Sequence, residues 1–140
     1  MRNEYEEKEE LYELAAEVLK EKQDLFMIAQ SGARIGFLTS TEYKKKNGRI
    51  TLADTRVVKG VWTHFVPYDF IITFYIRHTD LLSNEQLKIL MWHELKHCGV
   101  QPNGTFYAIP HDIEDFGVIL DKHGLNWANI EQVGGEVELE

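Results

Sequence analysis

The chain lacks the features that identify disulfide-stapled and membrane-spanning proteins. It has a single cysteine, Cys98, so no disulfide can form within it and the fold does not depend on an oxidising compartment. No apolar stretch approaches the roughly 18–20 residues that a membrane-spanning helix needs. The N-terminus is acidic and polar, whereas a signal peptide is basic and then apolar. We therefore expect a cytoplasmic protein with no membrane partner.

Basic residues are also scarce, since 15 lysines and arginines stand against 23 acidic residues and give a net charge of -8. Binding of a phosphate backbone needs a positive field, so nucleic acid is not expected as a partner. The only basic cluster, residues 44–46, precedes the turn signal Asn47-Gly48, and we expect a solvated turn there. Composition carries no information on the oligomeric state.

What is present is ordinary for a globular protein. The 140 residues are 44% hydrophobic and 27% charged, which is enough for one core in one domain covering residues 1–140. Apolar residues at three- and four-residue steps between residues 4 and 28 predict a helix with an acidic outer face within residues 1–30. Residues 132–140 are expected to be a loose tail.

Three strands are predicted between that helix and the next one. They cover residues 33–39, 49–58 and 70–76, and the last gives the strongest signal because its residues are β-branched or aromatic. The loop that follows residue 58 contains Trp62 and Pro67.

A second helix follows the strands. Ser83 and Gln86 form a capping-box pattern, which predicts a helix that runs to about Cys98 and ends at Gly99. Residues 100–110 read as a loop, and a last helix is expected from Pro110 or His111 to Gly124. Because helices and strands are grouped more than alternated, the predicted fold class is a layered α+β structure, not a doubly wound parallel sheet.

The segment His93-Glu94-Leu95-Lys96-His97, an HExxH pattern, carries the strongest chemical signal. Two histidines four residues apart on a helix lie on one face and can bind one zinc ion at about 2.0–2.1 Å. Glu94, rotated to the flank of that pair, can act as general base on a water molecule at the ion. The pattern is short enough to occur by chance. Its place in a capped, largely apolar helix after a strong strand favours a metal site.

A catalytic zinc ion needs a third protein ligand. The downstream candidates are His111, Asp112, Glu114, Asp115 and His123. We predict His111 as the ligand, because the loop before it can fold the last helix back across the first. Asp115, one turn further, is predicted to orient a zinc-bound imidazole, and the reverse assignment stays open, as does a role for Asp112. His123 is expected to favour the helix dipole at the C-terminal end of the last helix.

Other polar side chains receive simpler interpretations. Cys98 would point roughly 100° away from His97 on a helix and is interpreted as a core residue. His64 and His78 are expected in solvated loops. Tyr75, His78 and Tyr107 are candidates for extra oxyanion donors.

Residues 33–127 resemble the phage metallopeptidase family. The resemblance rests on ARIGFL at 33–38, KKNGR at 45–49, YDFIITF at 68–74, LMWHELKHC at 90–98 and HDIEDF at 111–116. The HExxH pattern is shared by many unrelated enzymes, whereas the strand sequence DFIIT at 69–73 and the segment HDIEDF at 111–116 are more specific. The resemblance implies a small zincin-like domain of phage or prophage origin in a bacterial host cell. It carries over His93, Glu94, His97 and His111 as site residues and names no substrate.

The predicted function is therefore that of a zinc-dependent metallopeptidase, a hydrolase with Zn²⁺ as cofactor and a peptide or protein as substrate. An extended substrate could pair with residues 70–76 or with the strand before them. An alternative is a non-catalytic zinc-containing interaction module whose surface is the acidic N-terminal helix. A third hypothesis, hydrolysis of another amide such as a cell-wall peptide, would require a separate export route. An imidazole-rich site also accepts other divalent metals.

Overall fold

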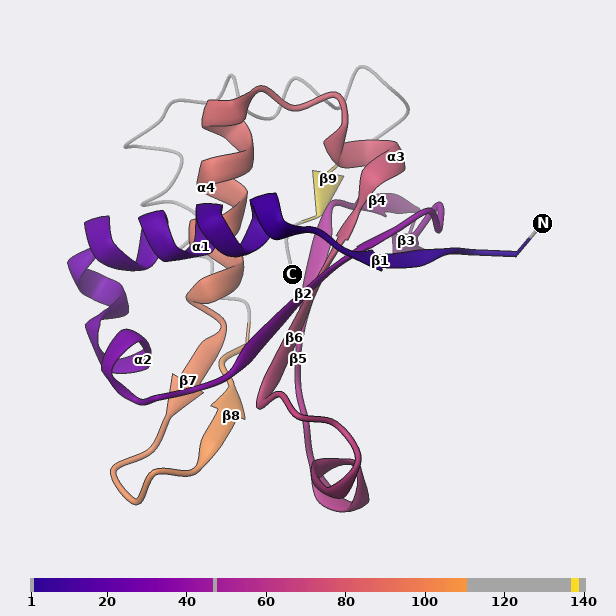
Figure 1. Ribbon diagram of the computed structural model, residues 1–140. Helices are drawn as coiled ribbons and strands as arrows, with labels where there is room; N and C mark the ends of the chain where they lie inside the picture. Colours follow the sequence, from indigo (N-terminus) through magenta and orange to yellow (C-terminus); the bar gives the residue numbers. More distant parts are fainter. Residues whose placement is uncertain (1, 47, 111–136, 139–140) are drawn as a thin grey trace.

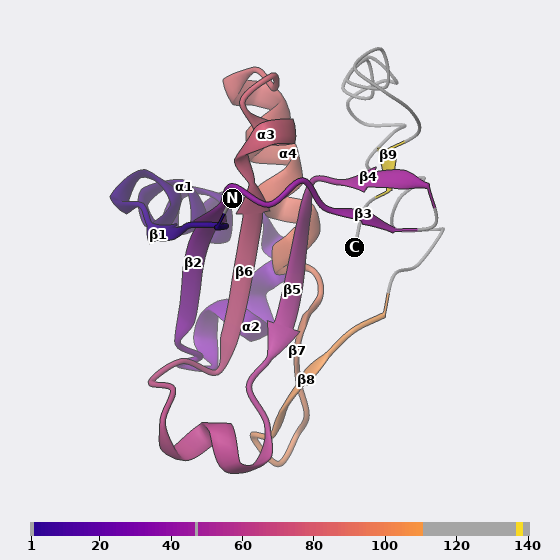
Figure 2. The same ribbon diagram turned by 90° about the vertical axis from the view of Figure 1, so that its right-hand side faces the viewer.

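The computed structural model describes residues 2–46, 48–110 and 137–138. A four-stranded mixed sheet in the order β1-β2-β6-β5 lies against a layer of helices (Figures 1 and 2). The strands are β1 (Tyr5–Glu7), β2 (Ile35–Ser40), β5 (Ala53–Val57) and β6 (Phe70–Tyr75). The helices on one face of the sheet are α1 (Glu9–Glu21), α2 (Phe26–Gln30) and α4 (Asn84–Leu95). This confirms the α+β class.

Strand β6 lies in the centre of the sheet. It runs parallel to β2 and antiparallel to β5, while β1 pairs antiparallel with the outer side of β2. Phe70, Ile72 and Phe74 alternate onto the helix-covered face and are at most 1% exposed. The strongest strand signal of the sequence thus becomes the central strand, and β5 is an edge of this sheet within the described residues.

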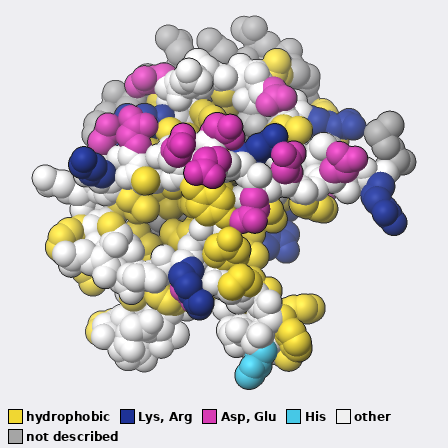
Figure 3. All heavy atoms as spheres, in the orientation of Figure 1, with side chains coloured by type: hydrophobic (Ala, Val, Ile, Leu, Met, Phe, Trp, Pro, Cys, Tyr) yellow, Lys and Arg dark blue, Asp and Glu magenta, His cyan; other side chains and the backbone are white. Residues whose placement is uncertain are grey.

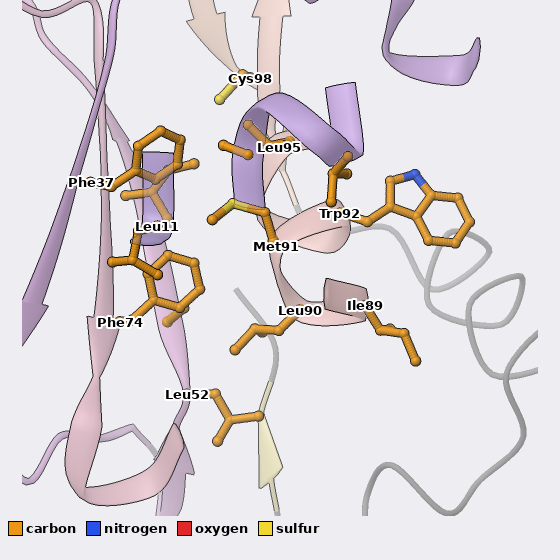
Figure 4. Close-up of a cluster of buried hydrophobic side chains, with 14 of the residues drawn as sticks. Leu11, Phe37, Leu52, Phe74, Ile89, Leu90, Met91, Trp92, Leu95 and Cys98 are labelled. Atoms are coloured by element: carbon orange, nitrogen blue, oxygen red, sulfur yellow. The ribbon is translucent and has the colours of Figure 1, made fainter. Parts of the chain in front are cut away.

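Helix α4 packs its apolar residues into this core. The predicted capping box is confirmed, because Ser83 accepts a hydrogen bond from the Gln86 N–H and the Gln86 side chain bonds back to the Ser83 N–H. Every residue of α4 from Ile89 to Leu95 is buried. Figure 4 shows Leu90, Met91 and Leu95 on the side that faces Phe37 and Phe74, with Ile89 and Trp92 on the other side. Among the described residues no helix has the length and apolarity to cross a bilayer.

The prediction of one N-terminal helix is wrong in its boundaries. Residues 5–7 form strand β1 and pair with residues 38–40 of β2, because backbone pairing along that edge overrides the helical pattern. Helix α1 starts at Glu9 and stops before Lys22, whose extended backbone (φ -99°, ψ 107°) breaks it. A short 3₁₀ turn, η1 (Gln23–Leu25), then leads into α2. Leu11, Ala15 and Val18 point inward, and the glutamates of α1 face outward as expected (Figure 3).

The strand predicted over residues 49–58 is two strands in different sheets. Strand β4 (Arg49–Thr51) pairs with β3 (Lys45–Lys46) and with β9 (Val137–Glu138), while β5 joins the main sheet. The break falls at Leu52, which is fully buried and whose carbonyl accepts a hydrogen bond from the Tyr75 N–H. Val137–Glu138 lie in the segment predicted as a loose tail, so that prediction is wrong for these two residues.

Two shorter segments also differ from the expected pattern. The loop predicted over residues 100–110 contains strand β8 (Phe106–Ala108), which forms a hairpin with β7 (Cys98–Val100). Strand β6 ends at Tyr75, because Ile76 begins the short helix α3 (Ile76–Thr79). Between β5 and β6 the chain forms a 3₁₀ turn, η2 (Gly60–His64).

Candidate metal centre

Helix α4 ends at Leu95, two residues before His97. The prediction that it continues to about Cys98 is wrong, because Cys98–Val100 pair with β8 as a strand. Lys96 keeps a helical backbone (φ -68°, ψ -18°), and the His97 N–H donates to the Glu94 carbonyl at 3.0 Å. This last turn is tighter than the helix and returns His97 to the side of His93.

The two imidazole rings lie nearly perpendicular to each other, with their centroids 4.9 Å apart. Their Nε2 atoms lie 3.3 Å apart, and His93 and His97 are only 3% and 8% exposed. A tetrahedral ion held at about 2.0–2.1 Å by both nitrogens would separate them by about 3.3–3.4 Å. The distance between the two Nε2 atoms therefore fits a shared metal ion.

The other nitrogen of His97 has a fixed partner. His97 Nδ1 lies 2.6 Å from the carbonyl oxygen of Ile109, and the Ile109 N–H donates to the His97 carbonyl at 2.7 Å. Because a carbonyl only accepts, Nδ1 carries the proton and Nε2 keeps its lone pair for a metal. No signal in the sequence marked Ile109, because the contact depends on the register of the β7–β8 hairpin.

Glu94 lies beside the pair in a fully buried position. Ligand atoms of His93, Glu94 and His97 all lie within 4.8 Å of one another, so these residues form a group that can hold a metal ion. The Thr55 hydroxyl of strand β5 donates to Glu94 Oε1 at 2.8 Å and lies 3.1 Å from the Glu94 carbonyl oxygen. Sequence analysis did not single out Thr55, which is 39 residues away from Glu94 in the chain.

The predicted third ligand lies outside the described residues. His111 and the alternatives Asp112, Glu114, Asp115 and His123 all fall in the segment 111–136. Their predicted roles therefore remain predictions.

The histidines upstream of the motif differ from each other. His64 is exposed in η2, as expected of a solvated residue. His78 is only 2% exposed, so the prediction of a solvated loop is wrong for it. It belongs to α3, its Nε2 lies 3.3 Å from the Lys44 carbonyl oxygen, and its ring packs edge-on against Tyr43. Burial lowers the pKa of His78 below its ordinary value.

Tyr75 lies on the other face of the sheet from the histidine pair. Its hydroxyl donates to Asp54 Oδ2 at 2.6 Å, and the ammonium of Lys44 lies 2.6 Å from the same oxygen. The pKa of Tyr75 is raised, mainly by burial and then by the hydrogen bond of the hydroxyl to Asp54. The prediction of a solvated turn is thus wrong for Lys44. The hydroxyl of Tyr75, a candidate oxyanion donor, bonds Asp54 on the face of the sheet away from the histidine pair.

Cys98 is a core residue, as predicted. It is 5% exposed and packs in the same cluster as Met91 and Leu95. Burial, and then the nearby charge of Glu94, raises the pKa of its thiol, so the sulfur stays protonated and is a poor metal ligand. Tyr107, the other candidate oxyanion donor, is partly exposed and its ring lies over Gly99.

Comparison with known proteins gives one result. The sequence model of the family described as "Putative phage metallopeptidase" matches residues 3–137, nearly the whole chain. No curated protein and no solved structure shows significant similarity to this chain. A metallopeptidase family implies a metal ion and a peptide or protein substrate, and the buried group of His93, Glu94 and His97 can hold such an ion. The chain therefore belongs to the family of putative phage metallopeptidases.

Proposed function

We propose that the protein is a zinc-dependent metallopeptidase with His93 and His97 as metal ligands and Glu94 as the general base. The observation that carries this proposal is the 3.3 Å separation of the two Nε2 atoms, with the buried Glu94 carboxylate beside them. Donor atoms of this kind and spacing suit zinc, although an imidazole pair also accepts other divalent metals.

The chain's own residues can perform the proton transfers of amide hydrolysis. A bound zinc ion would supply Lewis acidity to the substrate carbonyl and to the attacking water. Glu94 would accept a proton from that water on its carboxylate and then deliver the proton to the leaving nitrogen. Glu94 is fully buried, and the low local dielectric strengthens its interactions with charge that develops nearby.

His111 is proposed as the third ligand, with Asp115 as the residue that orients an imidazole. The support is the path of the described chain. Ile109, two residues before His111, makes two hydrogen bonds with His97, so the chain passes directly beside the histidine pair. Asp115 as the ligand, or a contribution from Asp112, stays the alternative.

Strand β5 is the proposed binding edge for a peptide substrate. Of the two strands that the sequence suggested, β6 is bonded on both sides, whereas β5 has β6 as its one neighbour in the sheet within the described residues. An extended peptide can add to such an edge through main-chain hydrogen bonds. Thr55 of this strand contacts Glu94, so a peptide paired with β5 would lie next to the general base.

The Glu94→Gln variant tests the proposal. Glutamine has nearly the same shape and cannot act as the base, so we expect bound zinc to remain at the wild-type amount while cleavage of a denatured protein substrate is lost. Glu85→Gln, at an exposed position of the same helix, is the matched control and should keep both. Loss of zinc from Glu94→Gln would make Glu94 a ligand, and retained cleavage would exclude it as the base.

A non-catalytic interaction module is the second candidate. Acidic side chains gather over α1 on the face shown in Figure 3, and the exposed glutamates of this helix are Glu9, Glu10, Glu13, Glu17 and Glu21. Zinc held by four protein ligands, without a position for water, would favour this role. X-ray absorption spectroscopy of the zinc-loaded protein distinguishes the two, because a water ligand favours the enzyme.

A further inference from the structure

We propose that Thr55 is a positioning residue that holds the Glu94 carboxylate in the orientation needed for proton transfer. The catalytic part of this inference rests on the function proposed above. The positioning part rests on the contact between two residues from different elements, the edge strand β5 and the last turn of α4.

The hydroxyl of Thr55 has one proton and two acceptors within reach. Glu94 Oε1 lies at 2.8 Å and the Glu94 carbonyl oxygen at 3.1 Å. The carbonyl already accepts the His97 N–H at 3.0 Å, whereas Oε1 is the nearer acceptor of the Thr55 hydroxyl. The distance to Oε1 lies within the usual range for an O–H···O bond and the distance to the carbonyl lies outside it, so the proton goes to the carboxylate oxygen.

Thr55 is itself held firmly. Its backbone pairs with Ile72 of the central strand, and the hydroxyl points to the face of the sheet that α4 covers. Threonine is β-branched, which restricts rotation about its first side-chain bond. The donor is therefore fixed before any substrate arrives.

Glu94 without this bond would have more freedom. A glutamate side chain has several rotatable bonds, and a single anchored oxygen removes most of the alternative orientations. A fixed Oε1 also sets where the second oxygen of the same carboxylate lies. Proton transfer requires the base within hydrogen-bond reach of the reacting atom, and a misplacement of about 1 Å can lower a rate about 100-fold.

The contact also joins the base to the proposed substrate edge. Thr55 directs its side chain at Glu94, while the outer backbone edge of the same strand is where a peptide would pair. One strand would thus set the position of both the substrate and the base. A substitution at Thr55 alters the side chain that contacts Glu94 and leaves the backbone edge of the strand in place. It should therefore lower the turnover rate more than it weakens substrate binding.

Three variants test the proposal. Thr55→Val keeps the shape and removes the hydroxyl, and Thr55→Ser keeps the hydroxyl. Thr73→Val makes the same change on the neighbouring strand, at a buried position on the opposite face of the sheet. Crystal structures of the metal-free full-length variants show the position of the Glu94 carboxylate. Zinc titration measures the metal affinity, and peptidase kinetics measure kcat and KM.

We expect Thr55→Val to move the Glu94 carboxylate and to lower kcat about 100-fold, with KM and zinc affinity within about threefold of wild type. Thr55→Ser should restore both the carboxylate position and most of kcat, and Thr73→Val should resemble wild type. An unmoved carboxylate in Thr55→Val, or equal losses in Thr55→Ser, would overturn the proposal. If the wild-type protein cleaves no peptide, the proposed function fails while the crystal structures still decide whether Thr55 positions Glu94.

Discussion

The Nε2 atoms of His93 and His97 lie 3.3 Å apart although His97 lies beyond the last residue of α4. Two features bring the second ring back to the first. The tight turn at residues 94–97 sets the direction of the chain, and the Ile109 carbonyl fixes the ring through Nδ1. The geometry of the histidine pair thus depends on the β7–β8 hairpin as well as on the helix.

Gly99→Ala tests the dependence on the hairpin. A Cβ at position 99 would lie 2.6 Å from the Tyr107 ring and 2.9 Å from Cγ1 of Ile109, so these two side chains must shift. We expect the shift at Ile109 to disturb its carbonyl, the partner of His97. We expect zinc affinity to fall about 10-fold or more and stability to fall by about 1–3 kcal/mol. Isothermal titration with zinc and urea denaturation measure the two effects.

The double variant Gly99→Ala/Tyr107→Ala serves as the control for that prediction. Removal of the ring relieves the closest contact, so part of the zinc affinity should return. Unchanged zinc affinity in Gly99→Ala would show that the hairpin does not position His97.

Lys44→Met tests the buried ion pair on the other face of the sheet. The Asp54 side chain is 7% exposed and its Oδ2 accepts from both Lys44 and Tyr75, so loss of the ammonium leaves a buried carboxylate with less compensation. Lys44 is itself 20% exposed, which reduces the effect through solvent screening. We expect a loss of about 1–3 kcal/mol by urea denaturation.

Lys20→Met, at an exposed position of α1, is the comparison for Lys44→Met and should change stability by less than about 0.5 kcal/mol. Equal effects of the two substitutions would mean that the ion pair does not stabilise the fold. Zinc binding should be unaffected in both variants, because Lys44 lies on the other face of the sheet from the histidines and Lys20 is exposed on α1.

His78 should make stability depend on pH. Burial, and then the charges of Arg77 and Lys45, lowers its pKa in the folded protein, against the opposing effect of its bond to the Lys44 carbonyl. Above about pH 6.5 the ring is neutral in both states. As the pH falls below this value the unfolded chain binds the proton first, so stability is lost down to the lower folded pKa.

His78→Gln removes this titration and keeps a side chain that can donate to the Lys44 carbonyl. Urea denaturation of the metal-free proteins at several values between pH 8 and pH 5 should show a smaller loss of stability in the variant than in the wild type. Parallel curves would show that His78 does not contribute to the pH dependence.

The sequence was informative where a feature is local. The capping box of Ser83 and Gln86 marked the start of α4, and the β-branched and aromatic run marked β6. Two histidines and a glutamate at fixed spacing marked a group that the structure brings together and that can hold a metal ion.

The features that the sequence did not reveal are long-range pairings. The end of α4 follows from the pairing of Cys98 with Ala108, and β1 exists because Tyr5 pairs with Ser40. The contacts of Thr55 with Glu94 and of Ile109 with His97 depend on strand register in the same way. Register depends on how the apolar pattern of one strand matches that of its partner and on the turn between them, so the pairing of strands that are distant in the chain does not follow from either segment alone.

The metal content of the purified protein tests the central claim most directly. We predict about one zinc ion per chain in the wild type, loss of most of it in His97→Ala, and wild-type content in His64→Ala, whose histidine is exposed in η2. Absence of metal from the wild type, with no binding of added zinc, would contradict the account, and so would equal zinc content in all three proteins.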